Sequence, residues 1–591
     1  MNPVIQAQLR EYVQANSLEL YSQDQQFEVY SIFSILNGLQ GETIDAYNVH
    51  LNGNEFGIDG IAILIQGELV KDRHEAKEKI ASINSPTIEF IFFQSKTSTG
   101  YDYGDISKFF DAISEFFDGS LKNESAAIAD LIGVKEEVYE TGVGKRNPKL
   151  SCYYATTGNY ESPDRIEKLR SGFIKQLLEK NIFDTKTMSI QIVGARDLQQ
   201  WYRAATSSVE VEIEFPRNVV MPINEHVEEA YLGFVDARNL LKLYTTTNSE
   251  DHSLAVNRTV FFDNIRDYDA TSKINIAIKD SVHSDGGKEF VFRNNGITVV
   301  SKNIDRTGDK FRLEDFQIVN GCQTCNVIFD LVYGDETGTG TNQILAETIQ
   351  VPFRLIGSKD DSFVSSIIVG TNSQNPVREE QFWALLPFMK SLEEFCRSLE
   401  TEQIIYIERR ENQYRSLPKI ERTRIMQPSV LMKAVAACLL FQPQRAARDY
   451  RGIVSEYEKA IFLDDHDVRI YHAVAYLYYR LEFLWRNQRI DSASKTFRYY
   501  ILAGIGLQIT DGNNTFAMKK KNRDAIASKV VELCGDEKLL KKEISAIVKI
   551  VDDQLKKLGA SSQERVRDTI RSESFFLVFK KELQKYKKMP L

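Results

Sequence analysis

The pattern of apolar residues changes twice along the chain, and this excludes a single repeated architecture. Helix-like and strand-like segments alternate up to about residue 208, strand-like segments with Asn-Gly turns follow, and nearly every segment after Gln427 is helical. At 591 residues the chain also exceeds the ~100 to 200 residues of one domain. The sequence therefore predicts an α/β domain at 1–208, an α+β domain at 209–427 and a helical domain at 428–591.

The first domain is expected to be an α/β layer structure, because its apolar residues alternate between helical and strand spacing. The stretch 71–86 is charged and is expected to be a solvated loop between the first two strands. The predicted elements are helices at 23–39, 106–117, 164–179 and 195–205, and strands at 58–65, 88–93, 150–156 and 188–193.

Composition limits the class of protein. Hydrophobic residues make up 42% of the chain and its mean hydropathy is -0.32, both typical of globular proteins. The best candidate for a membrane span, 430–441, is shorter than the ~18 residues required and contains Lys433. Six cysteines are too few for a secreted disulfide framework, so a soluble, cytoplasmic protein is expected.

Charge is unevenly distributed along the chain. The net charge is -9, yet residues 481–591 hold 23 Lys and Arg against 14 Asp and Glu. Because basic patches rather than totals decide phosphate binding, the acidic total neither supports nor excludes a nucleic-acid partner. The basic runs at 519–521 and 580–588 are either solvated helix faces or a surface that steers DNA.

Four polar residues of the first domain have the chemistry and spacing of a metal site. Asp59 lies at the mouth of one predicted strand, and Gln94 and Lys96 lie at the end of the next. Mg²⁺ takes oxygen ligands, so Asp59 and Gln94 would supply a carboxylate and an amide oxygen, and Glu28 could close the site from the preceding helix. Lys96 would lie on the same strand face as Gln94, where it can orient or deprotonate a water. The alternative is that these are polar residues at solvated strand ends.

The same residues resemble the PD-(D/E)XK nuclease superfamily over about residues 20–200. In that superfamily an acidic residue and a (D/E/Q)-x-K tripeptide bracket a β-hairpin behind an acidic helix. Asp59 matches the acid, Gln94 and Lys96 match the tripeptide, and Glu28 matches the helical acid. The departure is Gln94, whose neutral side chain leaves the number of metals open. The resemblance implies a restriction-endonuclease-like fold, a Mg²⁺ or Mn²⁺ cofactor and phosphodiester hydrolysis, with DNA as the expected substrate; the chemistry leaves RNA open.

Four polar phrases characterise the second predicted domain. They are Phe-Arg-Asn-Asn-Gly-Ile-Thr at 292–298, Gln-Ile-Val-Asn-Gly-Cys-Gln-Thr at 317–324, Thr-Asn-Ser-Gln-Asn-Pro at 371–376 and the arginine-containing stretch 406–414. Over about residues 230–430 they resemble the abortive-infection phage-resistance (AIPR) family, whose members carry Asn-Asn-Gly-Ile-Thr, Ile-Val-Asn-Gly-x-Gln-Thr and Asn-Ser-Gln in this order. Members of that family often have a nuclease-like N-terminal domain.

The amides of these phrases are candidates for a ligand-binding site, because polar groups at turns after apolar strands can converge on one ligand. The candidates for contact with a nucleotide or nucleic acid are Asn294, Asn295, Asn320, Gln323, Thr324, Asn372, Gln374, Arg409 and Arg410. The alternative is that the two Asn-Gly pairs only turn the chain. Cys322 and Cys325 have the spacing of half a zinc site, but no second pair follows, so buried small residues are expected there.

The sequence therefore predicts a cytoplasmic antiphage protein in which a Mg²⁺-dependent endonuclease is joined to a recognition or regulatory AIPR domain. The alternative is a non-catalytic protein with a degenerate nuclease fold that binds nucleic acid or a phage component. A homodimer and a phage-derived trigger are left open.

Overall fold

The computed structural model divides the chain into two compact units. The first comprises residues 1–13, 22–377 and 415–418, and the second comprises residues 14–21, 378–414 and 419–591. The predicted domain boundaries at 208 and 427 stay a prediction. The structure describes residues 2–41, 44–55, 57–81, 83, 85–121, 126–142, 147–183, 187–207, 209–247, 254–261, 279–280, 282, 287–333, 343–371, 386–400, 402–409, 413–414, 420–446, 450–457, 460–513, 515–560 and 563–586.

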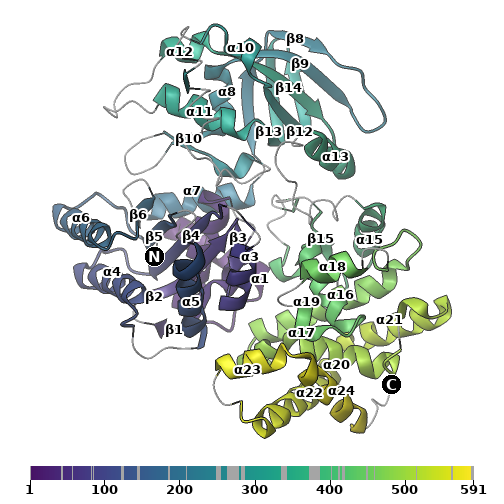
Figure 1. The fold of residues 1–591 in the computed structure, drawn as a ribbon. Coiled ribbons are helices and arrows are strands. Elements are labelled where there is room, and N and C mark those ends of the chain that lie inside the picture. Colours follow the sequence, from purple (N-terminus) through teal and green to yellow (C-terminus); the bar gives the residue numbers. More distant parts are fainter. Residues whose placement is uncertain are drawn as a thin grey trace. The chain divides into compact units, whose positions relative to one another are not determined.

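A mixed sheet forms the centre of the N-terminal part of the first unit (Figure 1). Among the described residues its strand order is β1-β2-β4-β5-β6, with β3 paired to β2; β1, β2 and β4 are antiparallel neighbours, whereas β5 and β6 continue parallel to β4. The elements are α1 (Pro3–Asn16), α2 (Gln23–Phe33), the π-helical turn η1 (Ser34–Leu39), β1 (His50–Glu55), β2 (Ile58–Ile65), β3 (Glu68–Val70), α3 (Arg73–Ala81), β4 (Ile88–Lys96), α4 (Tyr103–Asp118), α5 (Ala126–Glu137), η3 (Val138–Gly142), β5 (Lys149–Thr156), α6 (Asp164–Glu179), β6 (Met188–Val193) and α7 (Ala195–Thr206).

Apolar side chains bury the sheet between helices, as the alternating pattern predicts. One core joins β2, β4 and β5 to α3, α4, α5 and α6 and includes Phe92, Phe109 and Phe173. Aromatic side chains of α1, α2 and α7, among them Tyr12 and Tyr202, pack against each other in a separate contact. The eight elements predicted for this region are confirmed. Most of their ends match the prediction, the others shift by one to three residues, and the first helix ends in η1.

The prediction of a solvated loop over 71–86 is wrong, because α3 forms within it. The Asp72 carboxylate accepts hydrogen bonds from the backbone N–H groups of His74 and Glu75, which satisfies donors at the helix start. Ala76 and Ile80 lie four residues apart on one face and are buried in the core. Two small apolar contacts and a cap therefore contribute to the order of a segment whose composition is mostly charged.

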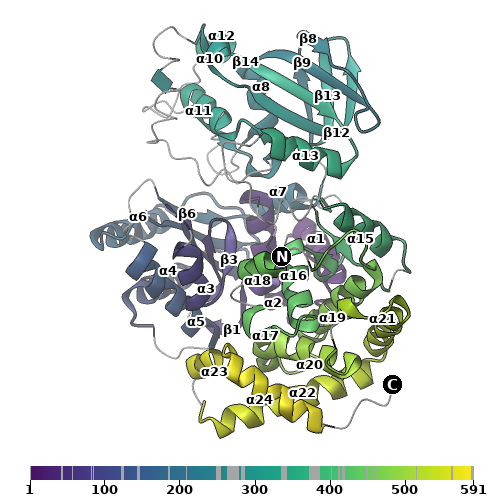
Figure 2. The same cartoon turned by 45° about the vertical axis from the view of Figure 1, so that its right-hand side comes forward.

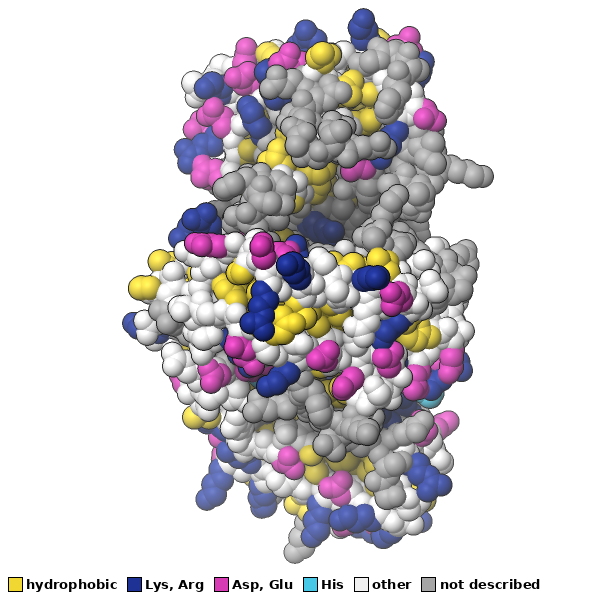
Figure 3. Space-filling model, turned by 90° about the vertical axis from the view of Figure 1, so that its left-hand side faces the viewer, with side chains coloured by type: hydrophobic (Ala, Val, Ile, Leu, Met, Phe, Trp, Pro, Cys, Tyr) yellow, Lys and Arg dark blue, Asp and Glu magenta, His cyan; other side chains and the backbone are white. Residues whose placement is uncertain are grey.

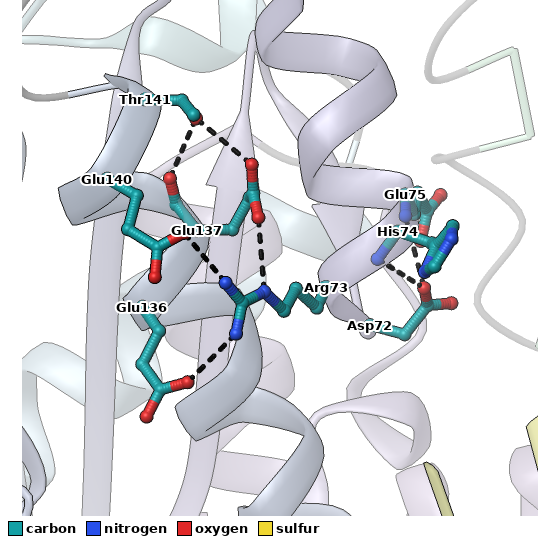
Figure 4. Close-up of polar contacts among 8 residues, drawn as sticks. All are labelled: Asp72, Arg73, His74, Glu75, Glu136, Glu137, Glu140 and Thr141. Atoms are coloured by element: carbon teal, nitrogen blue, oxygen red, sulfur yellow. Dashed lines mark hydrogen bonds and ion pairs between the residues drawn. The ribbon is translucent and has the colours of Figure 1, made fainter. Parts of the chain in front are cut away.

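Arg73 further anchors this helix to the neighbouring α5 and η3 (Figure 4). Its Nε donates to Glu137 Oε2 at 3.1 Å, while its terminal nitrogens donate to Glu136 at 3.2 Å and Glu140 at 2.7 Å. The Glu137 side chain is 4% exposed, so Arg73 supplies the charge partner of a buried carboxylate. Glu137 thereby links the packing of α3 to that of α5.

A second sheet forms the remainder of the first unit. In the described part of the chain its order is β7-β13-β12-β14-β9-β8; β12 and β14 are parallel and the other neighbours antiparallel. The elements are β7 (Glu210–Glu214), β8 (Arg217–Val220), β9 (Glu229–Asp236), α8 (Ala237–Tyr244), β10 (Thr245–Thr247), β11 (Leu254–Val256), α10 (Phe290–Arg293), β12 (Ile297–Thr307), β13 (Lys310–Asn320), α11 (Cys322–Tyr333), α12 (Gln343–Thr348), β14 (Gln350–Gly357) and α13 (Asp361–Thr371).

The second unit is mainly helical, which confirms the prediction of a helical C-terminal region. Its main core gathers side chains from most of its helices, among them the buried Trp485 of α19. The elements are α15 (Pro387–Arg397), β15 (Tyr406–Ile407), β16 (Ile425–Met426), α16 (Pro428–Cys438), α17 (Pro443–Ala446), α18 (Tyr450–Tyr457), α19 (Val468–Arg486), η7 (Ser492–Phe497), α20 (Arg498–Thr510), α21 (Lys520–Gly535), α22 (Glu537–Lys557), α23 (Gln563–Ile570) and α24 (Glu573–Lys585).

Charged side chains of both signs share the surface of the protein in Figure 3. On the face drawn in Figure 3, described Lys and Arg side chains are interspersed with Asp and Glu, so that face offers no broad surface of one sign. Within the described residues, no helix has the length and apolar content needed to cross a membrane.

Candidate active site

Two glycines flank the segment that carries Asp59: Gly60 faces helix α2, and Gly57 forms the turn before strand β2. A Cβ atom built on Gly60 would lie 2.7 Å from Ile32 Cδ1 of α2, so the end of that side chain would have to shift. Gly57 has φ +85°, a conformation that favours glycine. The turn and the close helix contact together bring Glu28, one turn before Ile32, near the start of β2.

Strands β2 and β4 place Asp59 beside Gln94. The strands are antiparallel with Gly60 opposite Phe93, so the next positions along them are Asp59 and Gln94. Asp59 Oδ2 accepts a hydrogen bond from Ser95 N at 2.6 Å, and the Gln94 side chain also bonds to the Asp59 carboxyl. Asp59 is 8% exposed and Gln94 is 2% exposed. The two predicted ligand residues thus form one buried cluster.

The Gln94 amide oxygen accepts no hydrogen bond from the described residues of this cluster. Gln94 Oε1 is shielded from solvent and has no hydrogen-bond partner among the described residues. A buried acceptor without a donor costs about 1–3 kcal/mol, so such atoms are rare unless a ligand or ion completes them. An amide oxygen beside a carboxylate is the donor set that a hard cation accepts.

Electrostatics around Asp59 also favour a positive partner. Burial is the largest cause that raises the pKa of Asp59, to about 8, and the nearby Glu28 carboxylate raises it further. The Ser95 N–H, the Lys96 ammonium and the Gln94 amide act in the opposite direction but do not balance burial. A divalent cation would favour the ionised carboxylate.

Histidine 50 is a member of the cluster that the sequence did not indicate. His50 Nε2 lies 2.6 Å from Glu28 Oε2, and the His50 side chain is 1% exposed. His50 belongs to β1 and pairs with Gly60 of β2, which places it next to the strand that carries Asp59. Strand β1 has the sequence His-Leu-Asn-Gly-Asn-Glu, which lacks strand-forming residues, so no pattern marked this histidine.

The four residues predicted for the first domain are therefore close together. Lys96 lies two residues beyond Gln94 on β4, on the same side of the strand. Its positive charge lowers the pKa of the Asp59 carboxyl. The described residues contain no group of three or more His, Cys, Asp or Glu side chains able to hold a metal ion. A cation at this site would therefore depend on Glu28 and Asp59 as carboxylates and on Gln94 as the neutral ligand.

The Asn-Gly phrases of the second sheet have a clear structural role. Gly296 has φ +84° and Gly321 has φ +96°, and a Cβ atom on either would collide with backbone or core atoms of the neighbouring segment. Asn294 Oδ1 accepts from Gly296 N at 2.8 Å, and Asn294 Nδ2 donates to Thr324 Oγ1 at 3.1 Å. These contacts fix the start of β12 against the start of α11, as the turn alternative expects.

The other predicted ligand contacts are distributed differently. Asn295 is exposed, Gln323 is half-buried, and Asn320 lies opposite Thr298 in the β12–β13 pair. Arg409 belongs to the second unit, where its Nε donates to Glu393 Oε2 at 2.6 Å in a buried network. That pairing argues against a phosphate-binding role for Arg409. Three of the predicted contacts lie outside the described residues: Asn372, Gln374 and Arg410.

The six cysteines differ in burial. All six are free thiols. Cys322 begins α11 and is partly exposed, whereas Cys325 is buried in the core of the second sheet. Burial raises the pKa of the Cys325 thiol well above its ordinary value. The expectation of small packing residues is thus met for Cys325, and Cys322 is less buried than expected.

Comparison with known proteins identifies the family. A family model described as AIPR protein matches residues 261–557, half of the chain, so the chain belongs to the AIPR family. The match supports a role in antiphage defence by abortive infection. No curated protein and no solved structure matches the chain. The first sheet and its polar cluster lie before the matched region.

Proposed function

We propose that the N-terminal part of this AIPR protein is a divalent-cation-dependent nuclease that hydrolyses phosphodiester bonds, with DNA as its substrate. The observation that carries the proposal is the buried Gln94 Oε1, which lacks a hydrogen-bond partner and lies beside Asp59 at the end of two antiparallel strands. The order helix α2, strands β2 and β4, helix α4 supports the resemblance to the PD-(D/E)XK superfamily and its restriction-endonuclease-like fold.

The residues have distinct roles in this proposal. Glu28, Asp59 and Gln94 would hold Mg²⁺ or Mn²⁺, and His50 would keep the Glu28 carboxylate directed toward the site. The bound cation supplies Lewis-acid stabilisation of the charge that develops on the phosphate. Lys96, on the same strand face as Gln94, orients the attacking water or takes part in its deprotonation. The buried surroundings of Asp59 and Gln94 exclude bulk water, which strengthens these interactions.

A cleavage assay tests the proposal. Purified protein is incubated with supercoiled plasmid in Mg²⁺, in Mn²⁺ and in EDTA, and the conversion to nicked and linear forms is measured. We expect cation-dependent cleavage by the parent and by Asp111→Ala, an exposed aspartate of α4, and none above background by Asp59→Ala. Equal cleavage by Asp59→Ala and the parent would remove Asp59 from the active site.

A second candidate function belongs to another class: a binding protein with a degenerate nuclease fold. The observation that favours it is the small number of acidic groups, since only two carboxylates accompany the neutral Gln94 and no three-ligand group occurs in the described structure. Under this alternative the parent binds nucleic acid but leaves DNA and RNA intact in every cation. The same assay, with a single-stranded RNA added as substrate, therefore separates the two functions.

A further inference from the structure

The β8–β9 hairpin of the second sheet exposes large apolar side chains. Val219 is 63% exposed, Leu232 41% and Phe234 45%. Val219 pairs with Leu232, and Arg217 pairs with Phe234, so these four side chains lie on one face at the edge of the sheet. Exposed apolar groups gathered on one surface commonly mark a binding site.

The strand register extends this surface across the sheet. Leu232 lies opposite Arg354 of β14, Arg354 lies opposite Thr298 of β12, and Thr298 lies opposite Asn320 of β13. Residues directly opposite each other in neighbouring strands point to the same side. A row of side chains therefore crosses five strands; we call it the sheet row, and it consists of Val219, Leu232, Arg354, Thr298 and Asn320.

Helices cover the two faces of this sheet unequally (Figures 1 and 2). The main core, with side chains of α8, α11 and α12, occupies the face opposite the sheet row. On the face of the sheet row, α13 covers one end, where Val364 and Ile368 pack on Val300 and Ile356. The part of the face that carries Leu232 and Phe234 retains exposed side chains beside this helix.

Arg354, at the centre of the sheet row, has no anionic partner among the residues that the structure describes. Its Nε is shielded from solvent without a hydrogen-bond partner, and no ion pair forms between Arg354 and the described residues. Its neighbours on that face, along its own strand and across it, are uncharged: Pro352, Ile356, Leu232 and Thr298. In contrast, Arg312 of the same sheet is exposed and paired with Glu210. A partly desolvated guanidinium among neutral groups is costly until an anion binds it.

We propose that the sheet row binds single-stranded nucleic acid, with a phosphate on Arg354 and a base against Phe234 and Leu232. Guanidinium groups match phosphate geometry, and exposed aromatic rings stack on bases that are not paired. Arg217, opposite Phe234, would contact a neighbouring phosphate. The site would combine β8 and β9, which precede the residues matched by the AIPR model, with β12, β13 and β14 inside that match. Because it uses no cation and none of the cluster around Asp59, it does not depend on the proposed cleavage activity.

The test measures binding by the full chain in EDTA, so that no strand is cut. Fluorescence polarisation follows a labelled oligonucleotide of about 15 nucleotides at several salt concentrations. We expect Arg354→Gln to raise Kd at least about tenfold and to lower the log–log salt slope by about 0.7, the contribution of one phosphate of a single strand. Phe234→Ala should raise Kd about fivefold or more and leave the slope unchanged, because stacking releases no counterions.

Matched controls lie in the same sheet. Arg312→Gln removes a guanidinium that is already paired, and Val220→Ala shortens an exposed side chain on the opposite face of β8, so both should bind as the parent does. Thermal unfolding checks that each variant is folded. If Arg354→Gln fails to fold, Phe234→Ala decides, because its side chain is partly exposed.

Four results would overturn the proposal. The first is that the parent does not bind the oligonucleotide. The second is that Phe234→Ala binds with unchanged affinity and any folded Arg354→Gln keeps the salt slope of the parent. The third is that a duplex of the same length binds equally or more tightly, and the fourth is that an equimolar nucleoside monophosphate competes fully. A dimer that sedimentation detects in the parent and that Phe234→Ala dissociates would instead assign this face to contact between copies of the chain.

Discussion

The substitution Gln94→Met tests whether Gln94 stabilises the fold or instead serves to bind a ligand. Methionine has a similar volume and no amide group. Gln94→Met therefore removes the buried Oε1 that lacks a partner, and it also removes the hydrogen bond between the Gln94 side chain and the Asp59 carboxyl. The matched control is Gln40→Met. Gln40 is also buried, but its Oε1 accepts from Arg258 Nη1 at 2.8 Å and its Nε2 donates to Tyr153 Oη at 2.5 Å.

The two substitutions should change the free energy of unfolding differently. Removing an unsatisfied buried acceptor returns about 1–3 kcal/mol, and losing one hydrogen bond costs about 1 kcal/mol, so Gln94→Met should leave β4 as stable as in the parent or more stable by up to about 2 kcal/mol. Gln40→Met loses two bonds and leaves Tyr153 and Arg258 with unpaired groups. Its cost should be at least about 2 kcal/mol.

Hydrogen exchange in EDTA measures these changes locally, which suits a chain of two units. Peptides from β4 should exchange at the parent rate or up to about 30-fold more slowly in Gln94→Met. Peptides from β5, which carries Tyr153, should exchange at least about 30-fold faster in Gln40→Met. Equal destabilisation by the two substitutions would mean that Gln94 Oε1 has a partner in the protein, and the argument for a cation there would fail.

Three further predictions concern packing, pH and positioning. Arg73→Met should remove the charge partner of the buried Glu137 carboxylate and speed hydrogen exchange in α3 by about 5- to 100-fold, or about 1–3 kcal/mol; an unchanged rate would refute the anchoring role. Burial opposes ionisation of Glu482, but its three cationic neighbours lower its pKa from 4.5 to about 2. The helical unit should therefore lose stability as pH falls from 4.5 to 2, and Glu482→Gln should flatten that dependence in acid unfolding followed by circular dichroism. His50→Ala should weaken Mn²⁺ binding about 10- to 100-fold by releasing Glu28, and unchanged titration calorimetry would exclude this positioning role.

The sequence predicts elements whose stability is local, and it misses elements that depend on distant partners. Helix α6 and strands β2 and β6 match their predicted limits: apolar residues at the expected spacing bury one face of α6, and the apolar run of β2 is buried along its whole length. Helix α3 escapes prediction, since Arg73 is paired with acidic residues more than sixty positions later. Its charged composition resembles a loop until those partners are known.

The candidate sites show the same limit. The sequence predicted four of the clustered residues because their types and order resemble the acidic residues and the (D/E/Q)-x-K tripeptide of the PD-(D/E)XK superfamily. These residues are Glu28, Asp59, Gln94 and Lys96. His50 was missed because its only signal is contact with Glu28, 22 residues earlier. Arg354 was missed because a single arginine in a strand is ordinary. The register places the uncharged Leu232 and Thr298 beside it, and no described residue gives it an anionic partner.

The measurement that tests the central claim most directly separates cation binding from cleavage. Titration with Mn²⁺ and single-turnover cleavage of DNA are compared in the parent, Lys96→Ala and the control Lys77→Ala, an exposed lysine of α3. If the cluster is an active site, Lys96→Ala binds Mn²⁺ as the parent does but cuts at least about 100-fold more slowly, a loss of about 2.7 kcal/mol, while Lys77→Ala cuts normally. Cleavage by Lys96→Ala at the parent rate would contradict the account.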